Sequence, residues 1–422
     1  MRLTSILALA GLTSAWVVPP HQETSVSDRP GRFSVKQVPN PNYVPCGPLV
    51  LAKAYNKYHV PIPEELRAAV KHVREGFVKR SNGSVETRPG DHGGDREFLT
   101  PVSIGTPGKI FNLDLDTGSA DMWVYSSLMP ENQVTEQTIY DPDESSTAKE
   151  LDGYTWRITY GDGSRSSGIV YKDVVTIGGL KVKNQSIGAA LKVSESFTKD
   201  GENDGLVGLS FGTLSTVSPQ QQMTLFENLL DDLDGPLSSP LTCGQAPVTG
   251  HYNFGYIDSE AYVGSISWVP VNDRRGWWEF LIPGYRVGDG SVEATDLWGI
   301  ADTGTTLLLL PKNIVKDYYR KVPGSSWHLW YGGYVVPCDV EIPNFSMAIG
   351  DSGFMIEIPG DYIKYQKLSR GYCYGGIQSS GQDDAIIGDV MLKSAFVVFD
   401  AGLKRLGWAK KKELNFPKSQ DD

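Results

Sequence analysis

The chain has 422 residues, of which 40% are hydrophobic, 10% aromatic and 21% charged. This composition supports a globular core and excludes a wholly disordered chain, and the length suggests two or three domains. No apolar run reaches the roughly 20 residues that a membrane-spanning helix requires, so we expect no membrane partner.

The net charge of −11 is unevenly distributed. Residues 1–80 carry 11 Lys and Arg against 5 Asp and Glu, whereas residues 81–422 carry 28 against 45. An acidic body repels phosphate backbones, which argues against nucleic acid as a partner. The natural partner of the basic segment is the acidic body that follows it.

The first 15 residues have the organisation of a secretory signal peptide. Arg2 provides the positive start, residues 6–12 form a short apolar run, and residues 13–15 offer a small-residue cleavage site. A buried N-terminal helix is the alternative interpretation. Signal peptides precede both extracellular and vacuolar proteins, and the polar C-terminus lacks the apolar tail of a lipid anchor, which favours an extracellular destination.

The segment from about 48 to 78 has the apolar spacing of a helix, and Pro63 suits a helix start. It ends at the basic pair Lys79-Arg80, which precedes the polar stretch 81–95. Exposed polar stretches are favoured sites of proteolysis. We therefore predict processing at Lys79-Arg80; two surface charges in a linker are the alternative.

After residue 96 the apolar residues alternate with a period of two. Residues 155–160 alternate, residues 161–164 form a turn sequence, and a second apolar run follows, which predicts a β-hairpin at 155–171. Residues 174–182 predict another hairpin around a Gly-Gly pair. The clearest helical pattern of this part, 314–322, is short, so we predict an all-β body.

Two segments of the body repeat one pattern. Asp-Thr-Gly at 116–118 recurs at 302–304, and each copy is followed about ninety residues later by two apolar residues and a glycine, at 206–208 and 386–388. One Asp-Thr-Gly arises by chance in such a chain with a probability on the order of 0.1. Two copies with matched trailing partners predict two homologous lobes.

The repeat carries a specific chemistry. If the lobes are related by an approximate two-fold axis, Asp116 and Asp302 meet at their junction. Two carboxylates at ~3 Å repel by roughly 5 kcal/mol at an effective dielectric of 20, so the pair holds one shared proton over a wide acidic range. Its ionised member can take a proton from a water while its protonated member binds a substrate carbonyl, which suits hydrolysis of an amide.

The neighbours of the two aspartates suit supporting roles. The glycines allow a sharp turn, and their amides can approach the carboxylates. The hydroxyls of the residues that directly follow the aspartates can bond to the backbone of the opposite lobe. The hydroxyls two positions further along the chain can donate to the outer carboxylate oxygens. These six residues are Thr117, Gly118, Ser119, Thr303, Gly304 and Thr305.

These motifs make the chain similar to the pepsin family of aspartic endopeptidases, especially its secreted fungal members of the penicillopepsin and aspergillopepsin kind. The resemblance rests on residues 111–124 and 299–307, with further matches at 160–164, 254–258 and 387–400. It implies a bilobal pepsin-like fold with two β-rich lobes around a substrate cleft, a catalytic pair formed by Asp116 and Asp302, and protein substrates cut at acidic pH with broad preference for hydrophobic residues. It implies no cofactor and no metal, and we expect a monomer.

The resemblance also implies a domain order. Residues 1–15 would be the signal peptide and 16–80 a zymogen propeptide, followed by an N-terminal lobe at 81–258 and a C-terminal lobe at 259–422. The 155–171 hairpin would be a mobile flap over the bound peptide. Its tip would hold Tyr160, with Gly161 next to it, and Trp123 would lie within hydrogen-bonding reach of the tyrosine.

Asp162, just after the flap tyrosine, prompts a specificity hypothesis. In fungal members an aspartate at this position can meet a lysine that precedes the cleaved bond, although Arg165 lies close enough in sequence to neutralise it. The alternative is that an aspartate stands there because it tolerates a tight turn.

The resemblance also assigns a role to residues 16–80, which we call the leader. Lys57-Tyr58 is similar to the pair that places an ammonium against the catalytic carboxylates of zymogens. The opposite charges of leader and body attract while the carboxylates are ionised and separate as they protonate, so we predict self-activation as the pH falls, with Lys79-Arg80 as an alternative processing site.

Four cysteines are too few for a disulfide-built scaffold. An oxidising compartment permits a Cys338–Cys373 bridge, worth ~4 kcal/mol in the entropy model, whereas Cys46 and Cys243 have no evident partners. Three sequons are candidate glycosylation sites: Asn82, Asn184 and Asn344.

The sequence does not contain the motifs that other hydrolytic mechanisms require. Three His follow residue 80, none in zinc-protease spacing, and no Gly-x-Ser-x-Gly elbow occurs. A glycosidase also uses two carboxylates, but nothing in that chemistry requires duplicated Asp-Thr-Gly loops. A catalytically silent binding protein on the same fold is the alternative from another class, and it would typically have lost an aspartate or the flap tyrosine.

Overall fold

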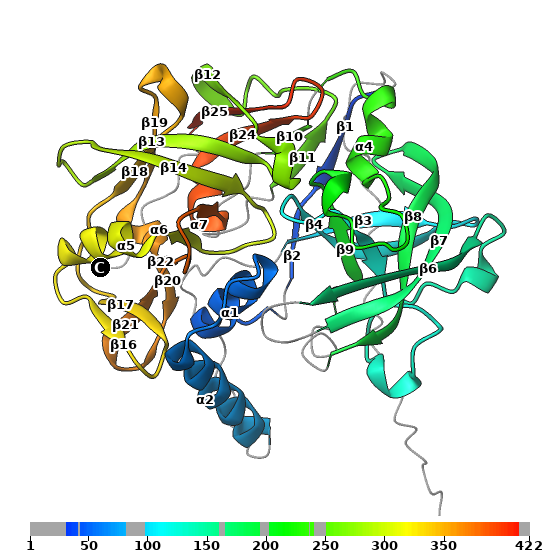
Figure 1. Ribbon diagram of the computed structural model, residues 1–422, viewed down its shortest axis with the longest axis horizontal. Helices are drawn as coiled ribbons and strands as arrows, with labels where there is room; N and C mark the ends of the chain where they lie inside the picture. Colours follow the sequence, from blue (N-terminus) through cyan, green and yellow to red (C-terminus); the bar gives the residue numbers. More distant parts are fainter. Residues whose placement is uncertain are drawn as a thin grey trace, which may run out of the picture.

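The computed structural model describes residues 31–40, 43–81, 98–159, 165–194, 202–235, 237–239 and 250–412. Within these ranges the protein is mainly β, as predicted (Figure 1). Several predictions fall outside the described residues: the signal peptide, the turn with Tyr160, Gly161 and Asp162, the sequon at Asn82, and Cys243.

The leader contains two helices where the sequence predicted one from about 48 to 78. Helix α1 spans Gly47–Lys57 and helix α2 spans Glu64–Ser81. The break between them contains Pro61 and Pro63, and a residue that precedes a proline disfavours the helical conformation. The chain therefore turns after α1, which ends at Lys57, and starts again immediately after Pro63.

An eight-stranded sheet forms the N-terminal half of the body. In spatial order its strands are β2 (Val38–Pro39), β3 (Phe98–Ile104), β4 (Lys109–Asp116), β9 (Gly205–Gly208), β5 (Met122–Val124), β8 (Leu180–Val193), β7 (Arg165–Ile177) and β6 (Lys149–Thr159). Both predicted hairpins are present: β6 pairs with β7, and Ile177 faces Leu180 across a two-residue turn. Gly178 and Gly179 in that turn have positive φ angles of 53° and 89°, which glycine adopts without strain.

The C-terminal half contains a seven-stranded and a four-stranded sheet. The first orders β19 (Met355–Ile358), β18 (Phe345–Ala348), β13 (Glu279–Val287), β14 (Glu293–Ala301), β23 (Ala385–Ile387), β15 (Leu308–Leu310) and β22 (Ile377–Ser379). The second orders β16 (Ser326–His328), β17 (Gly333–Pro337), β21 (Tyr372–Gly375) and β20 (Lys364–Lys367). The predicted helix after Pro311 is α5 (Lys312–Arg320), and this half also contains the short helices α6 (Gly360–Ile363) and α7 (Asp389–Leu392). The short helix α4 (Leu225–Leu229) belongs to the N-terminal half.

A six-stranded sheet unites the leader with both halves of the body. Its order is β1 (Phe33–Lys36), β11 (His251–Phe254), β10 (Leu237–Ser239), β24 (Ala395–Asp400), β25 (Arg405–Lys411) and β12 (Tyr262–Pro270). The leader strand β1 lies antiparallel to β11, where the rings of Phe33 and Phe254 stack 4.6 Å apart. The leader is thus part of the β framework, with α1 between the two halves (Figure 1).

The structure describes Cys46, Cys338 and Cys373. The predicted Cys338–Cys373 disulfide is present and lies between the chain just after β17 and strand β21. Cys46 is a buried free thiol before α1, and burial raises its pKa to about 11. In the part of the chain that the structure describes, no helix is both long and apolar enough to cross a membrane.

Candidate active site

The two Asp-Thr-Gly loops occupy equivalent places in the two halves. Asp116 is the last residue of β4 and lies opposite Gly208 of the parallel strand β9. Asp302 follows β14, whose last residue, Ala301, lies opposite Ile387 of the parallel strand β23. The trailing apolar-apolar-Gly motifs of the sequence are therefore the partner strands that support each loop.

Thr117 and Thr303 tie the loops to each other. The Thr117 hydroxyl donates to the carbonyl oxygen of Ala301 (3.0 Å), and the Thr303 hydroxyl donates to that of Leu115 (2.7 Å). Each hydroxyl also accepts a hydrogen bond from the backbone N–H of the other threonine, both at 3.0 Å. Four reciprocal hydrogen bonds between buried groups set the distance between the aspartates.

Gly118 and Gly304 serve both carboxyls. Their amides donate to the Oδ1 atoms of Asp116 (2.8 Å) and Asp302 (3.0 Å), respectively. A Cβ atom on Gly118 would lie 2.3 Å from Oδ1 of Asp302, and one on Gly304 would lie 2.3 Å from Oδ1 of Asp116. Each glycine therefore makes room for the carboxyl of the opposite loop, which the sequence pattern did not reveal.

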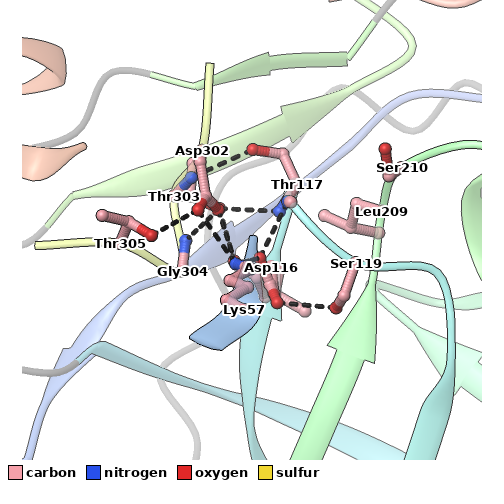
Figure 2. A network of polar contacts seen from close by, with 12 residues as sticks. Lys57, Asp116, Thr117, Ser119, Leu209, Ser210, Asp302, Thr303, Gly304 and Thr305 are labelled. Atoms are coloured by element: carbon pink, nitrogen blue, oxygen red, sulfur yellow. Dashed lines mark hydrogen bonds and ion pairs between the residues drawn. The ribbon is translucent and has the colours of Figure 1, made fainter. Parts of the chain in front are cut away.

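Hydroxyls hold the outer carboxyl oxygens. The Ser119 hydroxyl donates to Oδ2 of Asp116 (2.6 Å), and the Thr305 hydroxyl donates to Oδ2 of Asp302. Because each carboxyl is held on both sides, its orientation toward the other loop is fixed (Figure 2).

The leader inserts a cation between the two carboxyls. Nζ of Lys57, the last residue of α1, lies 2.7 Å from Oδ1 of Asp116 and 2.8 and 2.9 Å from the two oxygens of Asp302 (Figure 2). The Tyr58 hydroxyl donates to Oδ2 of Asp302 at 2.7 Å, and its ring lies 5.5 Å from that of Trp277. One ammonium thus contacts both members of a pair of buried acids.

The two carboxyls have opposite pKa shifts. Burial raises the pKa of Asp116; Lys57 opposes this and the charge of Asp302 reinforces it. Burial also acts to raise the pKa of Asp302, but the charge of Lys57 and the hydrogen bonds from Asp116, Lys57 and Thr305 outweigh it and lower that pKa to about 2. Asp302 therefore keeps its charge to a lower pH than Asp116 does.

Asp114 is a third acid of the site that sequence reasoning did not single out. It lies on β4 two residues before Asp116, and its side chain is half-buried. Burial raises its pKa to about 7, against the charge of Lys53 from α1. The signal that could have found it is the spacing, because residues i and i+2 of a strand share a face.

The remaining predicted site residues are dispersed. Trp123 on β5 is buried and stacks 5.6 Å from Trp156 of the β6–β7 hairpin. Lys79 and Arg80 lie in the last turn of α2. Asn184 is exposed on β8, whereas Oδ1 of half-buried Asn344 accepts a hydrogen bond from the amide of Gly360. Among the described residues, no three metal-ligating side chains gather into a group.

Comparisons with known proteins agree with this geometry. Residues 97–411 match the family model described as eukaryotic aspartyl protease. The chain is 50% identical to endothiapepsin of Cryphonectria parasitica, covering 90% of this chain and 91% of that protein. It is 45% identical to podosporapepsin of Podospora anserina (94% and 95% covered) and to penicillopepsin-1 of Penicillium rubens (86% and 87% covered). With its duplicated β halves in the bilobal pepsin-like arrangement, the chain belongs to the eukaryotic aspartyl protease family and is an aspartic endopeptidase.

Proposed function

We propose that the protein hydrolyses internal peptide bonds of proteins at acidic pH with Asp116 and Asp302 as its catalytic pair. The observation that carries this proposal is that both carboxyls contact the same ammonium, at 2.7 and 2.8 Å. Two acids within reach of one small cation are within reach of one water molecule after that cation leaves.

The pair then acts as both base and acid. The ionised carboxylate takes a proton from the water, whose oxygen attacks the peptide carbonyl carbon, while the protonated carboxyl donates to the carbonyl oxygen. Transfer of a proton to the amide nitrogen and rupture of the carbon–nitrogen bond then release the two products. The hydrogen bonds from Ser119 and Thr305 hold the carboxyls in place, and no covalent enzyme intermediate forms.

The β6–β7 hairpin is the proposed flap, with Tyr160, Gly161 and Asp162 at its tip. Stacking of Trp123 on Trp156 anchors the hairpin base. The substrate preference is broad for hydrophobic residues, and Asp162 adds acceptance of lysine before the cleaved bond. The ratio of cleavage after lysine to cleavage after phenylalanine should fall in Asp162→Ser; an unchanged ratio would exclude this role.

The enzyme is made as a zymogen whose leader, residues 16–80, inhibits it through Lys57 and Tyr58. Falling pH favours self-activation, and Lys79-Arg80 is an alternative site for a processing protease. Because that pair lies in the last turn of α2, cleavage there requires the turn to open, as helix ends do at low cost.

The proposed destination is extracellular, directed by residues 1–15, with the vacuole as the alternative. The mature protein is a monomer with lobes at 81–258 and 259–422, and its partners are protein substrates and its own propeptide. Glycosylation is expected at exposed Asn184 rather than at Asn344, whose side chain already bonds Gly360.

One experiment tests the core of the proposal. The precursor and its Asp302→Asn variant are expressed, brought to pH 3 to 6, and incubated with a peptide library with and without pepstatin. Acid-dependent cleavage that pepstatin and the substitution both abolish supports the proposal. A purified, folded parent protein without hydrolysis would instead favour the silent binding protein.

A further inference from the structure

The hairpin formed by β16 and β17 carries an apolar surface that the proposed catalysis does not use. Strand β16 lies at the edge of the four-stranded sheet. Trp327 of this strand, together with Leu329 and Trp330 in the connection to β17, exposes 42%, 66% and 63% of its surface, respectively. Exposed apolar side chains that lie together mark sites where a protein binds a partner. We call residues 326–333 the aromatic hairpin.

The leader shows what this surface accepts, because helix α2 lies against it (Figure 1). The ring of His72 lies 4.9 Å from that of Trp330. A Cβ atom on Gly332 would lie 2.9 Å from Cα of Leu66 and 3.1 Å from Cβ of Ala69. The missing side chain of this glycine therefore lets the helix backbone come close, and both leader residues are only 1% exposed.

The contact favours one pattern of residues on the bound helix. Residues three and four apart share a helix face, and α2 directs Leu66, Ala69 and Val70 toward the C-terminal half. The residue at position 69 has to be small, because the helix backbone lies directly against Gly332. Lys71 lies on the exposed side of α2. The aromatic hairpin thus fits an amphipathic helix with an apolar residue three positions before a small one.

The aromatic hairpin is within reach of a chain held at the catalytic pair. The leader itself spans the distance: Lys57 contacts both aspartates, and Leu66, nine residues later, lies against Gly332. Nine residues of extended chain cover at most about 32 Å. A substrate with about nine residues between its cleaved bond and such a helix can therefore occupy both places once the leader has left.

We propose that the aromatic hairpin of the active enzyme is an exosite, a binding site away from the catalytic pair, for amphipathic helical segments of protein substrates. This inference rests on the proposed proteolytic function and names a substrate class for it. A substrate helix with a small residue opposite Gly332 takes the place of α2. Binding there raises the effective concentration of the rest of the substrate at the catalytic pair, so KM falls while kcat stays the same.

A tethered substrate tests the exosite. A free peptide with one cleavable bond between a fluorophore and a quencher is compared with the same peptide joined by a flexible ten-residue linker to residues 64–81, which exclude Lys57 and Tyr58. The segment is attached on either side of the bond, and the lower KM of the two arrangements is used. Enzyme obtained by acid conversion of the precursor should show a KM about five- to tenfold lower for the tethered than for the free peptide.

Matched variants identify the contact. Ala69→Gln in the tethered segment keeps its charge and nearly its helix propensity, but it places a long side chain against Gly332 and should abolish the advantage in KM. Trp330→Ser in the enzyme should reduce the advantage to less than twofold. Leu403→Ser removes a 66% exposed apolar side chain between β24 and β25 and should retain the advantage.

Equal KM values for the tethered and free peptides would overturn the inference. So would an advantage that survives Ala69→Gln or Trp330→Ser, because the basic segment would then be attracted by the acidic body without a specific site. Hydrolysis of the free peptide without a tethered advantage rejects only the exosite. Absence of hydrolysis of both peptides rejects the proposed function, and the exosite with it.

Discussion

Asp116 and Asp302 end equivalent strands and receive equivalent hydrogen bonds from a glycine amide and a hydroxyl of their own loop, yet their pKa values shift in opposite directions. Part of this difference in pKa comes from the hydrogen bond between the two carboxyls, and part comes from outside the repeat. The Lys57 ammonium contacts both oxygens of Asp302 but one of Asp116, and the Tyr58 hydroxyl donates to Asp302 alone. The leader thus adds an asymmetric set of contacts to two equivalent loops.

The largest effect should follow removal of either acid. Asp116→Asn and Asp302→Asn should each lower kcat for peptide hydrolysis by roughly 10²- to 10⁴-fold, because the pair needs one base and one acid. Steady-state rates on a peptide at acidic pH measure this. Exposed Asp152→Asn, which removes the same charge, is the control. An activity above a tenth of the parent in either variant would contradict the paired role.

The second-largest effect should follow substitution of Lys57, and it should exceed the effect of substituting Tyr58. Lys57→Gln leaves two buried acids without a cation, which costs roughly 3–5 kcal/mol of leader binding. Tyr58→Phe removes one hydrogen bond to a charged group, worth about 1.5–3 kcal/mol. Hydrolysis by uncleaved precursor at pH 6 should therefore rise in both variants, more in Lys57→Gln. Equal effects would mean that the ammonium has no special share in inhibition.

The pH dependence of leader release follows from Asp302. Its pKa in the precursor is lowered from 3.8 to about 2, so leader binding is supported above the ordinary value and is lost as the pH falls toward 2. Release takes up a proton, and conversion of the precursor should accelerate across this window. Lys57→Gln should flatten the acceleration, whereas Lys57→Arg should keep it. Densitometry of precursor and product from pH 2 to 6 measures both.

The threonines that join the loops should affect stability rather than charge. Thr117→Val and Thr303→Val each remove two of the four hydrogen bonds, one to a buried amide and one to a buried carbonyl, at a cost of roughly 1–3 kcal/mol per group left unsatisfied. The carbonyl of Leu115 keeps a longer hydrogen bond from the Tyr252 hydroxyl (3.4 Å). Both should lower the free energy of unfolding in denaturant by similar amounts, because the four hydrogen bonds are reciprocal. Thr155→Val, on the exposed face of β6, is the control. A loss in one variant only would show that the loops are not equivalent.

The smallest effects should come from the outer hydroxyls, and they should be unequal. The Thr305 hydrogen bond contributes to the low pKa of Asp302, so Thr305→Ala should raise that pKa and move the acid limb of the pH–rate profile upward. Half-buried Ser119 faces Asp116, whose pKa is governed by burial and neighbouring charges. Ser119→Ala should move the profile less, and Thr305→Ser should restore the parent curve.

Local patterns predicted much of the fold. The alternation in 155–171 and the Gly-Gly turn at 178–179 act on residues close in sequence, so both hairpins followed from the sequence alone. The duplicated Asp-Thr-Gly motif predicted the two halves and both aspartates. The sequence pattern predicted one leader helix instead of two, because the apolar periodicity continues through two prolines. The backbone restriction that these prolines impose ends the first helix.

The amino-acid sequence by itself determined which residue types stand where the strands end, because turn and pleat preferences act over a few residues. Only the tertiary structure decided that Gly118 makes room for Asp302 and that Lys57 bridges two acids. The two contacts of Lys57 join residues that are 59 and 245 positions apart in the chain. Steric fit and Coulomb attraction both depend on distance in space, which no local sequence pattern contains.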